Sequence, residues 1–212
     1  MDTYDGWDVT TLDHLECGPA LIELGDAEGY ERFRRAAIAR FSNAEYPVAD
    51  RIVKVSLLLP ADAEVIRSLE SLVQVTLRTF NVTENPANED SFRAAWQCIS
   101  LALMEYRRGN FTSAAEWCRR CLAYTEYNAP RIATARVILA MSCQHLRLTQ
   151  EARSELARGR EAIEARFKTG LDRGSGTAGF WFDWVFARVL LREATALIEG
   201  PARPAEASPK AR

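Results

Sequence analysis

The fold is decided by the stretch LALMEYRRGNFTSAAEWCRRCL, residues 101–122. Apolar and small residues in its second half recur at the spacing of one helix face. Ala102 and Ala114 are small at the positions where two helices would cross closely, and Gly109 permits a left-handed turn residue. Asn110 can cap the helix that follows. The stretch therefore predicts a hairpin of two antiparallel helices.

The same hairpin recurs along the chain. Leu139-Ala140 and Ala152 align with Leu101-Ala102 and Ala114, in each case 38 residues further on. The second copy lacks the turn Gly and carries Arg147-Leu148-Thr149 at this point. A third, degenerate copy begins at Ala20 and runs through Gly25-Asp26. A repeat of this length indicates stacked hairpins that share one core.

Helical periodicity extends over nearly the whole chain, and Gly, Pro and Asn breakers divide it into about nine helices. Val53 to Leu59 could pass for a buried strand, but it continues a helical stripe from Ala49 and has no partner to pair with. The predicted class is all-α. The expected helix pairs and the final helix span 11–41, 46–80, 90–126, 130–168 and 180–199.

The Leu-small pair, the Gly-Asn-aromatic turn and the Ala that opens the second helix resemble the tetratricopeptide pattern. This resemblance implies a single solenoid domain of about four helix pairs over residues 11–199, with the last helix capping one end. On either side we expect an acidic N-terminal segment, 1–10, and a disordered Pro- and Ala-rich tail, 200–212.

A narrower resemblance is carried by LGDAEGY at 24–30, ADRIVK at 49–54, YRRGNF at 106–111 and LLREA at 190–194. These motifs are similar to those of the carboxy-terminal helical-repeat region of planctomycete-type bacterial serine/threonine protein kinases. The chain has no kinase nucleotide loop, catalytic Asp motif or metal-binding Asp-Phe-Gly. The resemblance therefore implies a kinase-associated interaction domain that is not itself an enzyme.

Composition excludes several other functions. With 27 basic and 29 acidic residues the net charge is −2, so general binding to nucleic acid or to anionic membranes is not expected. No leader or membrane-spanning segment is evident, which favours a cytoplasmic protein. The tract GSGTAG at 174–179 matches a dinucleotide fingerprint only formally, because no strand precedes it. We interpret it as a linker and expect no cofactor.

In tetratricopeptide geometry the first helix of each pair lines a concave groove, which here would suit a partner helix or an extended hydrophobic peptide. Ile99 stands where the Lys of the carboxylate-binding clamp would be, so chaperone-tail binding is not expected. Alternatively, the aromatic-rich helix 180–199 fills the groove. If the groove is not the binding surface, the next candidates for partner binding are the basic face of 131–168 and the acidic amino-terminal segment. The predicted groove residues are Trp96, Leu103, Tyr106, Arg107, Met141, Gln144 and His145.

Of these residues, Tyr106, Arg107, Met141 and His145 are expected to be partly exposed around one cleft.

The cysteines leave a second hypothesis open. Buried thiols are the common case, and the pair at 118 and 121 lacks the βαβ context of a redox motif. Four of them could instead meet between the two clear repeats and form a small-ligand or zinc site. These four are Cys98, Cys118, Cys121 and Cys143.

Overall fold

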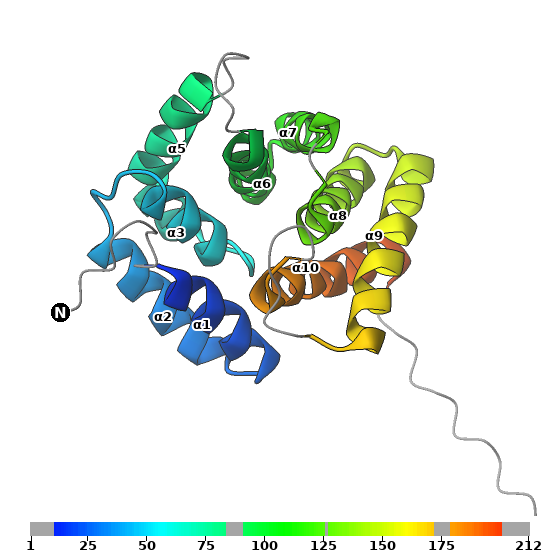
Figure 1. Ribbon diagram of the computed structural model, residues 1–212, viewed down its shortest axis with the longest axis horizontal. Coiled ribbons are helices and arrows are strands. Elements are labelled where there is room, and N and C mark those ends of the chain that lie inside the picture. Colours follow the sequence, from blue (N-terminus) through cyan, green and yellow to red (C-terminus); the bar gives the residue numbers. More distant parts are fainter. Residues whose placement is uncertain (1–10, 84–90, 126, 172–178, 201–212) are drawn as a thin grey trace, which may run out of the picture.

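The computed structural model describes residues 11–83, 91–125, 127–171 and 179–200, which form ten α-helices and contain no β-strand (Figure 1). The predicted all-α class is confirmed. The helices are Leu12–Glu23 (α1), Ala27–Arg40 (α2), Val48–Ser56 (α3), Ala63–Ser68 (α4), Glu70–Thr83 (α5), Ser91–Arg108 (α6), Phe111–Ala123 (α7), Ala129–His145 (α8), Thr149–Thr169 (α9) and Trp181–Glu199 (α10).

The helices pair as α1/α2, α3/α5, α6/α7 and α8/α9, and each pair lies within a few residues of its predicted range. The short helix α4 was not predicted. It forms between the members of the second pair because Asp62 Oδ1 accepts a hydrogen bond from the Val65 N–H at 2.8 Å, which caps a new helix after Pro60. The segment that could have been a strand ends α3 instead.

Three of the turns within pairs share one geometry. Gly25, Gly109 and Arg147 have φ angles of 77°, 83° and 61°, and Arg147 stands 38 residues after Gly109, as the repeat alignment predicts. After Gly109, the N–H of Asn110 returns to the Glu105 carbonyl at 2.9 Å; Leu148 N–H reaches Cys143 in the same way. Helical hairpins therefore repeat along the chain.

Asn110 is the N-cap residue of α7, as predicted, but it does not cap the helix with its side chain. Its side chain makes no capping hydrogen bond to the helix that follows; its Nδ2 instead donates to Glu105 Oε2 at 2.7 Å. Glu105 lies on the preceding helix, and its carboxylate accepts a charge-assisted hydrogen bond from the Asn110 amide. Asn110 thus starts α7 through its carbonyl, which accepts from the Ala114 N–H at 3.0 Å, while its side chain ties the turn to α6.

The helices form two layers, with α1, α3, α6, α8 and α10 inside and α2, α5, α7 and α9 outside (Figure 1). The inner helices run parallel. Ser100 Oγ donates to the Asp50 carbonyl at 3.3 Å, and Arg107 donates to the Leu57 carbonyl at 3.0 Å. The second contact lies seven residues after the first on both segments, so α6 and α3 run in the same direction. At the other side, Gly179 at the start of α10 abuts Pro130 at the start of α8.

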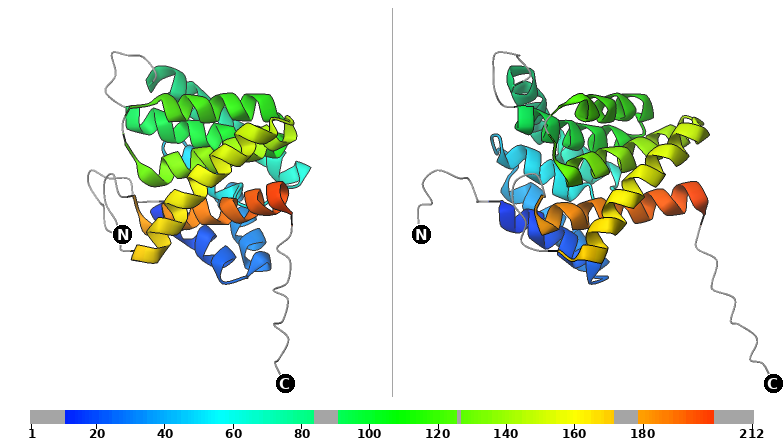
Figure 2. Two further views of the ribbon diagram at one scale, coloured as in Figure 1. Left: turned by 90° about the vertical axis from the view of Figure 1, so that its right-hand side faces the viewer. Right: turned by 45° about the vertical axis from the view of Figure 1, so that its right-hand side comes forward.

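The inner layer closes on itself. Consecutive inner helices pack together, and α10 packs against α8 and α9 on one side and against α1 on the other (Figures 1 and 2). We predicted that the last helix would cover one end of an open array. Instead it joins the last pair to the first, because its largely apolar surface is wide enough to bury against both.

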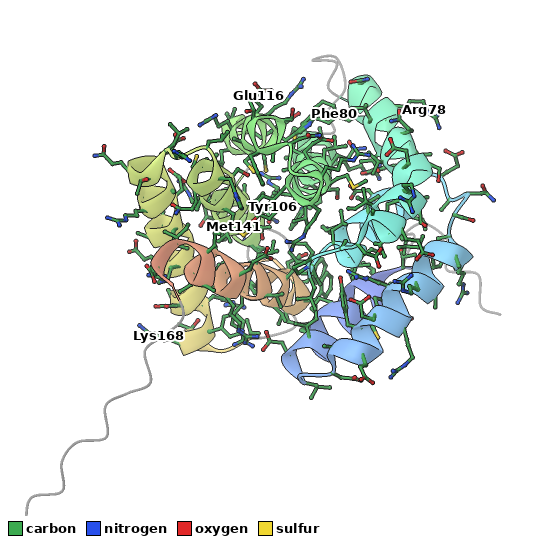
Figure 3. All side chains as sticks on the ribbon, turned by 180° about the vertical axis from the view of Figure 1, so that it is seen from behind. Arg78, Phe80, Tyr106, Glu116, Met141 and Lys168 are labelled. Carbon is green, nitrogen blue, oxygen red and sulfur yellow. The ribbon has the colours of Figure 1, made fainter. Side chains whose placement is uncertain are left out.

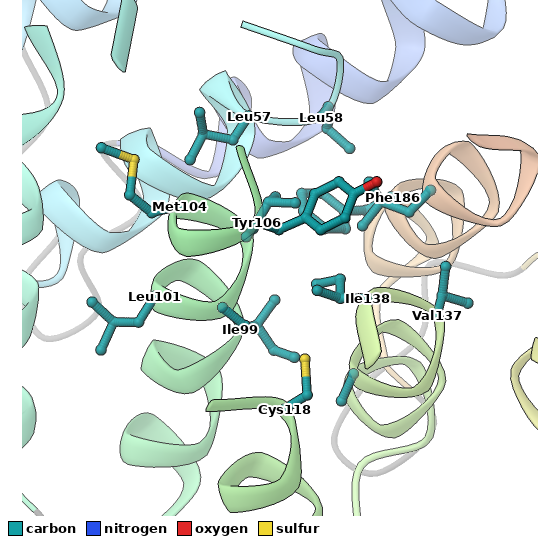
Figure 4. Packing of buried hydrophobic residues seen from close by; sticks show 14 of the residues in the cluster. Leu57, Leu58, Ile99, Leu101, Met104, Tyr106, Cys118, Val137, Ile138 and Phe186 are labelled. Atoms are coloured by element: carbon teal, nitrogen blue, oxygen red, sulfur yellow. The ribbon is translucent and has the colours of Figure 1, made fainter. Parts of the chain in front are cut away.

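Small residues permit the close helix crossings, as predicted. Ala102, Ala114 and Ala152 are fully buried, whereas Leu122, which we expected to be buried with them, is only partly covered. The core that they border is continuous from α3 through α6 and α8 to α10, and Leu57, Ile138 and Phe186 meet in it around Tyr106 (Figure 4).

In the parts of the chain that the structure describes, none of the helices combines the length and apolar character needed to cross a bilayer. The predicted acidic segment, 1–10, and the tail after Gly200 lie outside the described residues, as does most of the Gly-rich tract.

The turn at Arg147 leads to a stability prediction. A non-glycine residue in the left-handed region is strained, so Arg147→Gly should raise the free energy of unfolding by about 0.5–1 kcal/mol. Gly109→Ala, the matched change in the first copy, should lower it by a similar amount. Urea denaturation followed by circular dichroism measures both. A destabilised Arg147→Gly variant would contradict the proposed equivalence of the two turns.

Candidate functional site

Most of the predicted groove residues lie in the interior of the ring rather than around an open groove. Trp96, Leu103 and Met141 are buried, and Tyr106 is 7% exposed. Tyr106 and Met141 lie between α6, α8 and α10 (Figure 3). The expectation that Tyr106, Arg107 and Met141 border an open cleft is therefore wrong, because α10 fills the space.

Arg107 makes the central contacts of this interior, and its side chain is only 4% exposed. Its Nε and Nη2 donate to the carbonyls of Leu57 and Leu58, each at 3.0 Å, at the end of α3. Its Nη1 and Nη2 donate to the two carboxylate oxygens of Glu193 on α10, at 2.5 and 2.7 Å. One guanidinium thus holds three inner helices together, and the paired geometry is of the strong, bidentate kind.

Tyr106 and His145 extend the contacts to α8. The Tyr106 hydroxyl lies 3.4 Å from His145 Nε2, and the His145 ring stacks on Phe111 with the ring centroids 3.9 Å apart. Burial and, to a smaller extent, the nearby Glu193 carboxylate raise the pKa of Tyr106 to about 12. His145 is exposed and Gln144 is partly exposed, so only this edge of the predicted groove reaches the surface.

A second polar group lies deeper, between α3, α6 and α10, and was not predicted from the sequence. Lys54 is buried with its Nζ 4.2 Å from the Trp96 ring centroid, and it interacts with the buried carboxyl groups of Asp50 and Asp183. Burial raises the pKa of Asp183, Lys54 partly offsets the rise, and the resulting pKa is about 6. Burial also raises the pKa of Asp50. In a repeat protein such a cluster fixes how neighbouring helices align.

Asp183 should make stability depend on pH. Its pKa is higher in the folded chain, at about 6, than the ordinary value of 3.8, so the folded state holds the proton more tightly. Its contribution to the free energy of unfolding therefore falls as the pH rises from about 4 to about 6. Asp183→Asn removes this loss, worth up to about 3 kcal/mol.

Urea denaturation of the wild type and Asp183→Asn at pH values from 4 to 7 checks this prediction, with the exposed Asp13→Asn variant measured alongside as a control. The stability of Asp183→Asn relative to the wild type should grow with pH and level off above pH 6. A difference that stays constant over the whole range would contradict the prediction.

The geometry gives the hypothesis of a cysteine metal site no support. Cys98, Cys118, Cys121 and Cys143 do lie near one another, since the other three all act on the pKa of Cys118. However, within the described ranges no three His, Cys, Asp or Glu side chains are arranged to hold a metal ion. Burial raises the pKa of Cys118 and raises that of Cys121 to about 12, so both thiols are protonated at neutral pH. Cys121 Sγ instead donates to the Ala95 carbonyl at 3.2 Å.

An open cleft of about 600 Å³ lies elsewhere, between α9 and α10, which cross at an angle (Figure 2). Ile163 and Leu191 form its apolar floor, and the Arg188 guanidinium covers Phe167, 3.6 Å from the ring centroid. Each helix contributes residues at the spacing of one helix face. These residues are Arg160, Ile163, Glu164 and Phe167 from α9, and Arg188, Leu191, Arg192, Thr195, Ala196 and Glu199 from α10.

Charged side chains form the rim of the α9–α10 cleft. Arg160 donates to both carboxylate oxygens of Glu199, at 2.8 and 2.9 Å, and this pairing lowers the pKa of Glu199. On the opposite side, Arg188 and Arg192 both donate to one oxygen of Glu23 on α1, at 2.5 and 2.9 Å. Two guanidinium groups thus share one carboxylate, which leaves an excess of positive charge on the α1 side.

The α9 wall lies within residues 131–168, the basic stretch that was the next candidate after the groove. The α10 wall was missed. Its spacing is visible in the sequence at 188, 191, 192, 195 and 196, but periodicity alone cannot tell an uncovered helix face from one covered by a neighbour. The predicted groove and the open cleft therefore lie on different faces of α10.

Comparison with protein-family models, with curated proteins and with solved structures finds no match to this chain. The tetratricopeptide and kinase-tail resemblances remain predictions from the motifs. The observed class is an all-helical array of repeated hairpins.

Proposed function

We propose that this chain is a non-catalytic protein-interaction domain and that its binding surface is the α9–α10 cleft. One observation carries the proposal: the cleft combines an apolar floor with a charged rim, the composition of a surface that binds a polypeptide. The floor supplies affinity by excluding water, and the rim supplies orientation. The concave groove is not available for this role because α10 occupies it.

The buried polar residues support a structural role for the ring interior. Arg107, Glu193 and Lys54 each bind groups on neighbouring helices; the side chains of Arg107 and Lys54 are buried, and that of Glu193 is 26% exposed. On the basis of the motif resemblance, one class of partner is a component of serine/threonine kinase signalling. A scaffold or adaptor of this kind would use the repeats as a rigid support and the cleft as its contact surface.

The proposal is tested by blocking the cleft. Ala196 is exposed in the cleft on α10, so Ala196→Arg should fill the apolar floor with a charged side chain and leave the fold intact. Ala36→Arg, at an exposed position on α2, is the matched control. Tagged full-length variants are used for affinity capture from native cell extract, and captured proteins are identified by mass spectrometry.

The wild type and Ala36→Arg should capture the same partner, and Ala196→Arg should lose at least about 90% of it, as expected for a change at the centre of an interface. Circular dichroism confirms that all three are folded. Equal capture by all three folded proteins would contradict the cleft as the binding surface.

A further inference from the structure

The outer helices follow one packing rule. Each lies across its own inner helix and the next inner helix along the ring: α2 contacts α1 and α3, α5 contacts α3 and α6, α7 contacts α6 and α8, and α9 contacts α8 and α10 (Figure 1). This arrangement covers the outward face of each of the first four inner helices. The next inner helix after α10 is α1, because the ring is closed.

Within the described residues, α10 is the fifth inner helix and has no outer helix of its own. The position that such a helix would take lies over α10, between α9 and α1. The open cleft faces this position from the α9 side, and the ion pairs of Arg188 and Arg192 with Glu23 lie on the α1 side. The uncovered face therefore continues the surface on which the other outer helices pack.

We propose that the cleft takes a single amphipathic α-helix from another polypeptide, which packs on α10 as the fifth outer helix. This inference rests on the proposed function and names the form of the partner. An apolar groove that binds a helix contacts anchor side chains at every third or fourth position of that helix. The α10 face has cleft-lining residues at the same spacing.

The length of the face sets the length of the partner. Residues 188–199 of α10 extend over about 16 Å at 1.5 Å per residue, which corresponds to about three helical turns. Ala196 and Thr195 are small, so a partner backbone can approach closely at one end, and Arg188, which covers the Phe167 ring, lies at the other. A partner helix of three to four turns therefore matches the cleft.

Charge fixes the orientation of the partner. Arg188 and Arg192 share the single carboxylate of Glu23, and Arg192 is 55% exposed, so a partner carboxylate can reach it. On the α9 side, Arg160 is already paired with Glu199. The helix should therefore carry Asp or Glu along the edge that faces α1, where charge-assisted hydrogen bonds become available.

Residues 201–212, PARPAEASPKAR, do not have the sequence of this helix. They contain three Pro residues and no Leu, Ile, Val, Met or aromatic residue that could enter the apolar floor. Residues 201–212 are therefore not the helix that we propose for the cleft.

The test uses two displayed peptide libraries of equal length, selected on the full chain. One carries Leu at helical i, i+3, i+4 and i+7 positions with randomised edges, and the other carries Pro at every third position so that it stays extended. We expect binders from the helical library, with acidic residues along one edge. Arg192→Glu should weaken their affinity about tenfold by fluorescence anisotropy, whereas Arg32→Glu, at an exposed position on α2, should leave it unchanged.

The outcomes separate the two claims. Binders that come only from the extended library and are blocked by Ala196→Arg would overturn the helical partner and keep the proposed function. Helical binders whose affinity is unaffected by both Ala196→Arg and Arg192→Glu would overturn this inference by placing the site elsewhere. Binding of the chain to itself, detected by analytical ultracentrifugation and abolished by Ala196→Arg, would replace the separate polypeptide with a second copy. Absence of any binder from the helical library would overturn the helical partner, and equal capture in the extract experiment would overturn the proposed function as well.

Discussion

The Arg107 guanidinium is the contact on which the arrangement of the inner helices depends. It belongs to α6, caps the end of α3 by donating to two backbone carbonyls, and pairs with Glu193 of α10. A helix end that is buried needs partners for its carbonyl groups, and a buried cation needs a carboxylate. The Arg107 side chain meets both requirements. The positions of α3, α6 and α10 relative to one another are therefore fixed by these contacts.

This constraint decides where a partner could bind. An open hairpin array exposes the faces of its inner helices, but here α10 is bound through Arg107 and the first helix is bound to α10 through Glu23. The interior therefore serves stability, with Lys54 and Asp183 adding a second polar layer. The binding surface that we propose is the outward face of α10, which lies where the ring closes and the pattern of outer helices ends.

Helix positions and the equivalence of the turns were predictable because they depend on short-range spacing: Gly109 and Arg147 are 38 residues apart and adopt the same left-handed turn. Ring closure was not predictable, because it depends on pairs such as Arg107 with Glu193 that lie 86 residues apart. Tyr106 and Met141 were correctly grouped but were wrongly expected to be exposed. The same apolar stripe fits an open groove and a filled one, and only the position of α10 separates them.

The closed ring is tested most directly by hydrogen exchange on the wild type and an Arg107→Met variant, which keeps the apolar stem and removes the charge. If the guanidinium holds α10 in place, amides of α10 and α1 should exchange at least about tenfold faster in the variant, while those of α7, α8 and α9 keep their protection. Equal protection of α10 in both proteins, or a uniform loss over all helices, would contradict the account.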